Sequence, residues 1–157
     1  MSRHCPTRRT IVGGLVAIAA VPGSVAGLTA TNASGQTGAA NMQIRCVFDR
    51  HSFTATLLDI PPARDLVALL PLDLAIEDYS TNEKIAYLPR KLTENGSGPF
   101  RDEAPGDLCY FAPWGNLAFF HGNYRYSNGL IRLGRLDGGA QPLLTRGKYP
   151  LRIELLS

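Results

Sequence analysis

The stretch GDLCYFAPWGNLAFF, from Gly106 to Phe120, indicates how this chain folds. Two short apolar runs, 108–112 and 117–120, flank the break Pro113-Trp114-Gly115-Asn116. Apolar runs of this length, bounded by proline and glycine, are typical of buried strands joined by a turn. Because the only tryptophan, Trp114, stands beside a glycine, the turn is also a candidate binding loop in which a ligand approaches an exposed ring.

The segments around this stretch add further strands. Alternation of apolar and polar residues predicts a hairpin and two more strands, over residues 43–48, 52–58, 72–79 and 149–156, and residues 130–136 are expected to form another strand with Gly134 inside it. Pro61-Pro62 favours the start of a helix that Pro71 ends, and residues 140–146 are predicted to form one helical turn. The sequence therefore predicts a mainly β fold, a small closed β-barrel with one or two short helices, because closure removes exposed sheet edges.

Residues 1–26 are predicted to be an export signal. A basic start precedes an apolar stretch shorter than the ~20 residues needed to span a bilayer, and the small-residue pattern Ser24-Val25-Ala26 follows. The string from Thr7 to Val12 resembles the twin-arginine motif, so Arg8 and Arg9 are the predicted signal residues. We therefore expect a periplasmic or secreted protein without a membrane attachment after leader removal. A buried N-terminal helix or a membrane anchor is the alternative.

The small, polar and uncharged residues 27–41 predict a flexible spacer, which leaves residues 42–157 for the folded domain. The whole chain has 16 Lys and Arg residues, 13 Asp and Glu residues, and a net charge of +3. Arg3, Arg8 and Arg9 supply this excess, because the predicted signal contains no acidic residue. A formally neutral domain lacks the basic stripe that binds phosphates, so no nucleic-acid partner is expected.

The domain resembles the bacterial cyclophilin-like fold family between Ile44 and Glu154. The segments that carry the resemblance occur in the same order over this whole range: Pro62–Leu66, Leu69–Leu72, Glu77–Tyr79, Glu83–Ile85, Tyr87–Lys91, Gly106–Leu108, Ala112–Leu117, Tyr126–Ser127 and Gly129–Gly134. The resemblance implies a barrel like that of cyclophilin, with helices at its ends. It does not imply cyclophilin activity, because isomerases of that group resemble one another in a Phe-His-Arg motif. The nearest string, Phe120-His121-Gly122, lacks the arginine.

Candidate ligand-binding residues combine aromatic rings with hydrogen-bonding groups, as binding pockets do. They are Tyr87, Arg90, Trp114, Asn116, Tyr126 and Arg132. The alternative is that the rings pack the barrel and Arg90 pairs with a surface acid. Glu77, Asp78 and Glu83 have the chemistry of an acid or base, but carboxylates so close in sequence are more typical of a solvated edge.

Cys46 and Cys109 are the only cysteines after the predicted leader, and both lie in predicted strands. A disulfide between them and two buried free thiols are both compatible with the sequence. His51 and His121 stand apart from other metal ligands, and no metal-binding spacing, nucleophile elbow or phosphate loop appears. No metal, cofactor or catalytic residue is therefore predicted.

Together these features predict an exported binding or accessory module that holds a peptide or a small molecule against the Trp114 loop. The alternative is a prolyl isomerase with a rearranged active site, in which Arg90 or Arg132 takes the role of the missing arginine. A hydrolase would need a nucleophile–base pair, and the sequence shows none. The sequence indicates neither the identity of the ligand nor the number of subunits.

Overall fold

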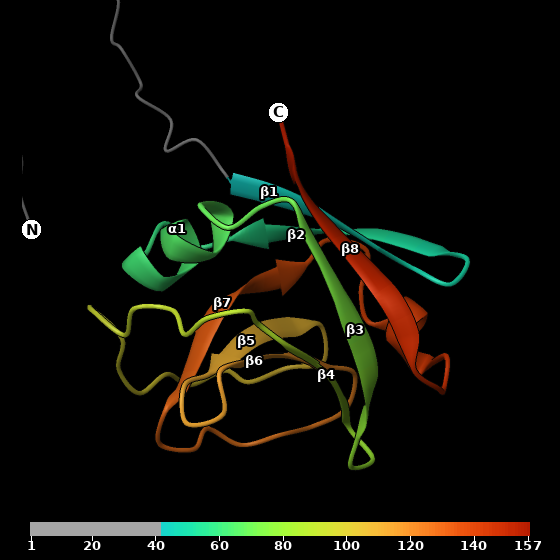
Figure 1. Cartoon of the computed structure of the whole chain (residues 1–157). Coiled ribbons are helices and arrows are strands. Elements are labelled where there is room, and N and C mark those ends of the chain that lie inside the picture. The colour runs from blue at the N-terminus through green and yellow to red at the C-terminus, as the bar shows by residue number, and fades with distance from the viewer. Residues whose placement is uncertain (1–41) are drawn as a thin grey trace, which may run out of the picture. The chain divides into compact units, whose positions relative to one another are not determined.

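In the computed structural model, which describes residues 42–157, the alternating segments pair edge to edge until the sheet closes on itself (Figure 1). The strands are β1 (Met42–Phe48), β2 (His51–Leu57), β3 (Leu72–Tyr79), β4 (Glu83–Tyr87), β5 (Asp107–Phe111), β6 (Asn116–Phe120), β7 (Leu130–Leu136) and β8 (Tyr149–Leu156). The α-helix is α1 (Pro61–Val67), and η1 (Gln141–Leu144) is a 3₁₀ helix. The predicted mainly β fold, a small closed β-barrel with short helices, is confirmed. The predicted signal 1–26, with Arg8 and Arg9, and the predicted spacer 27–41 lie outside the described residues.

The order of the strands around the barrel differs from their order in the chain. It runs β1, β2, β7, β5, β6, β4, β3 and β8, and every pair of neighbours is antiparallel. β1 pairs with β2 on one side and with β8 on the other, which closes the sheet. The β5–β6 hairpin lies between β7 and β4. Side chains from β4, β6 and β5 therefore share one outer surface.

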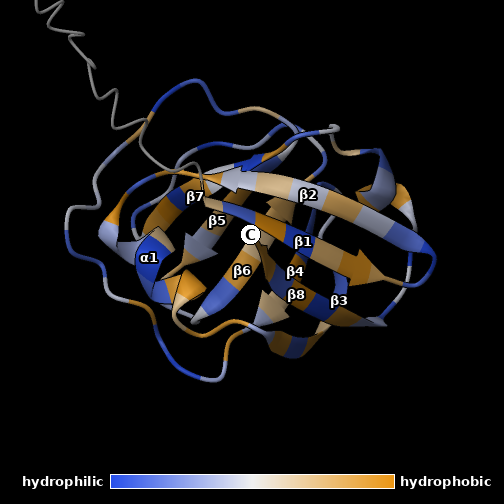
Figure 2. Cartoon of the chain, turned by 90° about the horizontal axis from the view of Figure 1, so that it is seen from above, coloured by the Kyte–Doolittle hydropathy of each residue, from blue (hydrophilic) through white to orange (hydrophobic). Residues whose placement is uncertain are grey.

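Alternate residues of each strand fill the barrel. Along β1, Ile44, Cys46 and Phe48 are buried in the core, while Arg45 is exposed. Phe53 and Leu57 extend the same core from β2. Figure 2 shows this alternation as bands of apolar and polar colour along β1 and β2. The period of two follows from the pleat, which sends successive side chains to opposite faces of a sheet.

The two helical segments lie at opposite ends of β2. α1 follows the end of β2 and buries Ala63 and Leu66 against the barrel core. Near the start of β2, Thr145 Oγ1 lies 2.6 Å from His51 Nε2, and η1 buries Leu143 in the core. α1 ends at Val67, earlier than Pro71 predicts, because the amides of Leu69 and Leu70 bond to carbonyls three residues back and tighten the last turn.

β6 is buried on both of its faces. Leu117 and Phe119 belong to the barrel core, whereas Ala118 and Phe120 join a second cluster on the outside with Cys109 and other residues. The loops between β4 and β5 and between β6 and β7 cover this outer cluster with rings from Phe100, Tyr124 and Tyr126. An apolar run without alternation results, since both faces of the strand are covered.

Within residues 42–157, no helix has the length and apolar character needed to cross a membrane.

Candidate functional site

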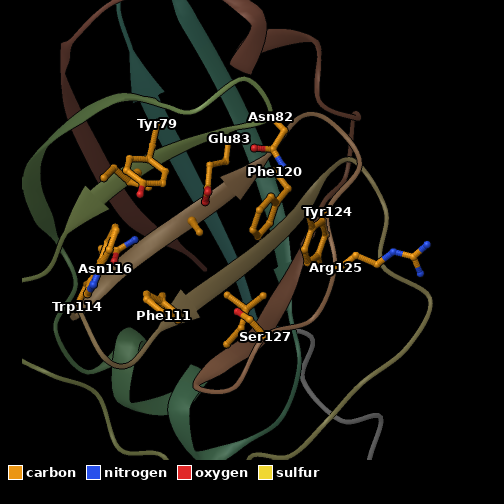
Figure 3. A pocket seen from close by; sticks show the side chains of 13 residues that line it. Tyr79, Asn82, Glu83, Phe111, Trp114, Asn116, Phe120, Tyr124, Arg125 and Ser127 are labelled. Carbon is orange, nitrogen blue, oxygen red and sulfur yellow. The ribbon is translucent and has the colours of Figure 1, made fainter.

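A pocket of about 340 Å³ lies on the outer surface of the barrel, over β4, β6 and β5 (Figure 3). Its lining comes from these strands, from the ends of β3 and β7, and from the turns between strands. The lining residues are Tyr79, Asn82, Glu83, Ile85, Phe111, Trp114, Asn116, Ala118, Phe120, Tyr124, Arg125, Ser127 and Leu130. A volume of this size matches the lower end of the range for small-molecule sites.

The pocket exists because a small residue stands in the middle of β6. The outward positions of β6 are Asn116, Ala118 and Phe120, and all three line the pocket. Ala118 lies opposite Ile85 on β4 and opposite Cys109 on β5. A methyl group between two larger neighbours leaves a hollow in the surface, and the surrounding aromatic side chains form its walls.

Two groups of aromatic rings enclose the hollow. Trp114 packs edge to face with Tyr79, at 5.4 Å between ring centroids, and with Phe111 at 5.5 Å. On the other side, Phe120 and Tyr124 are stacked with their centroids 3.6 Å apart. Figure 3 shows the pair Tyr79 and Trp114 facing the pair Phe120 and Tyr124 across the pocket. Trp114 is 47% exposed, so its ring is accessible to a ligand.

A buried aspartate holds the second of these walls in place. The carboxylate of Asp107 is fully buried and accepts a hydrogen bond of 2.7 Å from the hydroxyl of Tyr124. It also accepts bonds from the Ala104 amide at 3.1 Å and from Arg135 Nε at 2.5 Å. This bond to Asp107 and the burial of Tyr124 both raise the pKa of Tyr124, with burial the larger cause. Asp107 therefore fixes the loop that carries Tyr124, since the carboxylate that accepts these bonds is itself buried.

Two polar groups with hydrogen-bond acceptors face the pocket without a partner among the described residues. Burial raises the pKa of the Glu83 carboxyl to about 7. Neither a hydrogen bond nor an ion pair within residues 42–157 involves the Glu83 side chain. Asn116 is only 2% exposed, and its Oδ1 atom accepts no hydrogen bond from any described residue. Buried polar atoms normally have partners, so Asn116 Oδ1 is an exception within the pocket, as His121 Nε2 is outside it.

The structure brings two of the six predicted binding residues to this pocket, Trp114 and Asn116. Tyr87 is 51% exposed at the end of β4, opposite Asn116, but it does not line the pocket. The Tyr126 ring packs against Phe100 at 5.3 Å.

The two predicted arginines do not line the pocket, and each pairs with a carboxylate. Arg90 Nη2 and Nη1 bond to the two oxygens of Asp65 at 2.6 and 3.1 Å, and this contact lowers the pKa of Asp65. Arg132 Nη2 lies 3.2 Å from Asp102 Oδ1, and its guanidinium lies 4.7 Å from the Phe100 ring centroid. Arg90 thus pairs with an acid, as the alternative interpretation expected, and Arg125 is the arginine that lines the pocket.

Sequence reasoning passed over several pocket residues, above all Tyr79, Phe120 and Tyr124. Tyr79 and Phe120 lie directly opposite Glu83, on the two strands beside it. Because the strand order around the barrel does not follow the chain, the sequence alone did not place them next to each other. Contrary to the expectation from the sequence, Asp78 and Glu83 do not share one solvated edge. Asp78 binds the fully buried Lys84 at 2.8 Å, whereas Glu83 lines the pocket.

The structure does not join Cys46 to Cys109. Both are free and buried, Cys46 in the barrel core and Cys109 in the outer cluster, and burial raises the pKa of each thiol to about 12. The disulfide left open by the sequence is therefore not formed, because the wall of the barrel separates the two side chains. Residues 42–157 also contain no group of three His, Cys, Asp or Glu side chains arranged to hold a metal ion.

Comparisons with known proteins agree with this architecture. The model of the cyclophilin-like family matches residues 46–154. A search of curated proteins finds no match. Among solved structures, the chain is similar to a hypothetical protein from Archaeoglobus fulgidus, known from a solution structure. The TM-score is 0.57 at 16% sequence identity, and the similarity covers 73% of this chain and 94% of that chain. At this identity the similarity supports the fold alone.

Proposed function

The chain belongs to the cyclophilin-like family, and from that premise we propose that it is an exported, non-catalytic binding module with its ligand site in the outer pocket over β4, β6 and β5. The ligand is a small molecule or a side chain of a peptide. Export rests on the leader pattern, with Arg8 and Arg9 as the signal residues. The pocket itself is the argument for binding.

The observation that carries this proposal is the combination of accessible aromatic walls with a buried acceptor that has no partner. A structural role alone accounts for packed rings, but it does not account for a buried amide oxygen left without a donor beside a hollow. Leaving such an atom unsatisfied costs about 1–3 kcal/mol, and a bound ligand removes this cost. Asn116 Oδ1 is that atom, and it lies next to the exposed ring of Trp114.

The isomerase alternative needs an arginine at the ligand site. Arg90 and Arg132, the two considered for that role, are paired with Asp65 and Asp102 and do not line the pocket. Arg125 lines it, but in Figure 3 its guanidinium is directed away from the other labelled side chains. These positions favour binding without prolyl isomerisation.

The test is a fragment screen against the purified full-length chain, read by the fluorescence of Trp114, which is the only tryptophan in the sequence. We expect saturable changes for some fragments, and their loss in the variant Ala118→Leu, whose larger side chain fills the hollow. A prolyl isomerisation assay is run in parallel on proline tetrapeptides that vary the residue before the proline. Acceleration that disappears in Arg125→Ala with unchanged fold would replace the binding module by an isomerase. A screen without any pocket ligand would remove the proposal.

A further inference from the structure

The carboxylate of Glu83 lies between aromatic rings rather than beside a positive charge. In the barrel, Glu83 on β4 lies opposite Tyr79 on β3 and opposite Phe120 on β6. Side chains at directly opposed positions of antiparallel strands have their Cβ atoms about 4.5–5.5 Å apart on the same face of the sheet. Figure 3 shows the carboxylate pointing into the pocket between these two rings. Trp114 continues the aromatic wall beyond Tyr79.

This arrangement places two features that attract positive charge around one hollow. Aromatic rings carry negative charge on their faces and attract cations, most strongly in the case of tryptophan. A carboxylate without a partner attracts a cation as well, and the buried Oδ1 of Asn116 supplies a second acceptor for an N–H donor. A negatively charged ligand would meet repulsion from the carboxylate and from the ring faces.

The charged and titratable groups around Glu83 leave room for a cation. They are Tyr79 from β3, Cys109 from β5, and Tyr124 and Arg125 from the loop between β6 and β7. Asp107 and Arg132 also act on Cys109, but Asp107 accepts the Tyr124 hydroxyl and pairs with Arg132 at 3.5 Å, so their charges offset each other. Tyr124 and Cys109 are neutral at physiological pH, because burial raises the pKa of each. Arg125 is exposed, and in Figure 3 its guanidinium is directed away from Glu83.

We propose that the pocket binds an alkylammonium group, with its charge on the carboxylate of Glu83 and its alkyl part against the ring of Trp114. This inference rests on the proposed function, because it assigns the ligand class of the same pocket. Primary and quaternary ammonium groups share the charge and the alkyl part, whether they belong to a free small molecule or to a lysine side chain, and a primary one also has N–H donors for Asn116 Oδ1.

The proposal predicts a specific pH dependence of ligand binding. Since burial raises the pKa of Glu83 to about 7, the carboxyl is mostly ionised at pH 8 and mostly protonated at pH 5.5. The ionised fraction at pH 5.5 is about one thirtieth of that at pH 8. Binding of a quaternary ammonium, whose own charge does not titrate, should therefore weaken between these pH values, by at most about thirtyfold if the protonated carboxyl contributes no affinity.

The experiment compares choline with 3,3-dimethyl-1-butanol, its uncharged isostere, on the full-length chain by Trp114 fluorescence and calorimetry. We expect choline to bind at least tenfold more tightly than its isostere at pH 8, and this preference to fall severalfold at pH 5.5. Glu83→Gln keeps the shape of the side chain and should abolish both the preference and the pH dependence. Glu94→Gln makes the same charge change at an exposed position outside the pocket and should leave both unchanged.

A further comparison distinguishes the source of the ammonium group. Tighter binding of a peptide with trimethylated lysine than of choline would indicate a protein partner, and the reverse order would indicate a free small molecule; either order is consistent with the proposal. Equal binding of choline and its isostere, tighter binding at pH 5.5, or no choline binding at all would each overturn it. The fragment screen with Ala118→Leu still decides the binding module separately, because neutral fragments remain able to bind.

Discussion

The close approach of β7 to β2 at Gly134 makes a strong prediction about stability. A Cβ atom added at Gly134 would lie 2.2 Å from the carbonyl oxygen of Thr56 and 2.9 Å from the Cα atom of Leu57. Real Cβ atoms essentially never approach other atoms within 3.0 Å. In Gly134→Ala the two strands must therefore separate by about 0.8 Å, the difference between 3.0 and 2.2 Å.

The cost of this separation follows from the nature of the neighbouring atoms. They belong to the backbone of β2, so no flexible side chain can move aside. Overpacking in a well-packed interior typically costs 1–3 kcal/mol, and a backbone clash belongs at the top of that range, so we expect about 3 kcal/mol. At about 4 °C for each kcal/mol in a domain of this size, the melting temperature should fall by about 12 °C.

Thermal and urea unfolding followed by circular dichroism measure this loss. Gly138→Ala is the matched control, because no atom lies within 4 Å of its added Cβ, and it should change stability by less than about 1 kcal/mol. If Gly134→Ala were as stable as Gly138→Ala, the close approach of β2 and β7, and with it the reason for a glycine in this strand, would be refuted.

Three further predictions concern the pocket and its surroundings. Ala118→Leu should fill the hollow and abolish the change in Trp114 fluorescence on ligand binding, while circular dichroism shows an unchanged fold; retained binding would place the site elsewhere. Arg90→Ala removes an exposed ion pair with Asp65, so unfolding assays should show a loss of at most about 1 kcal/mol, with ligand affinity unchanged because Arg90 does not line the pocket. Since burial raises the pKa of Glu83 from 4.5 to about 7, ionisation of this carboxyl destabilises the folded state as the pH rises through that window. Glu83→Gln should therefore be more stable than the natural chain at pH 8 by about 2 kcal/mol, allowing for partial solvation of the carboxyl, and equally stable at pH 4. Equal melting temperatures of both proteins at pH 8 would contradict the burial of Glu83.

The strands that bury only one face could be predicted from the sequence. Ile44, Cys46 and Phe48 alternate with polar or exposed positions, and the structure buries all three in β1. The bounds of β7 and β8 match the predicted segments, and in β8 the apolar–polar period of two gives the reason. The turn at Trp114 was predicted for a similar reason, because proline and glycine interrupt two apolar runs.

Only part of the candidate site could be predicted from the sequence. Trp114 and Asn116 stood out as an unusual ring and an amide in a turn, and both line the pocket. Glu83 was interpreted as part of a solvated edge, because its neighbour Asp78 carries the same charge. The structure separates the two side chains. Asp78 lies opposite Lys84 and shares its face of the sheet, whereas Glu83 precedes Lys84 in β4 and therefore faces the other side.

The sequence by itself determined the strands other than β4 and the helical turns, because these depend on local periodicity and on the positions of proline and glycine. Closure of the barrel followed from the exposed edges that an open sheet would carry. Only the tertiary structure decided which residues of β5 and β6 face outward, because both faces of these strands are buried and their apolar runs carry no alternation. It also decided that β6 lies between β4 and β5, which brings Tyr79, Glu83 and Phe120 together across three strands. The pocket is a product of strand order, and strand order arises from long-range pairing that no local pattern encodes.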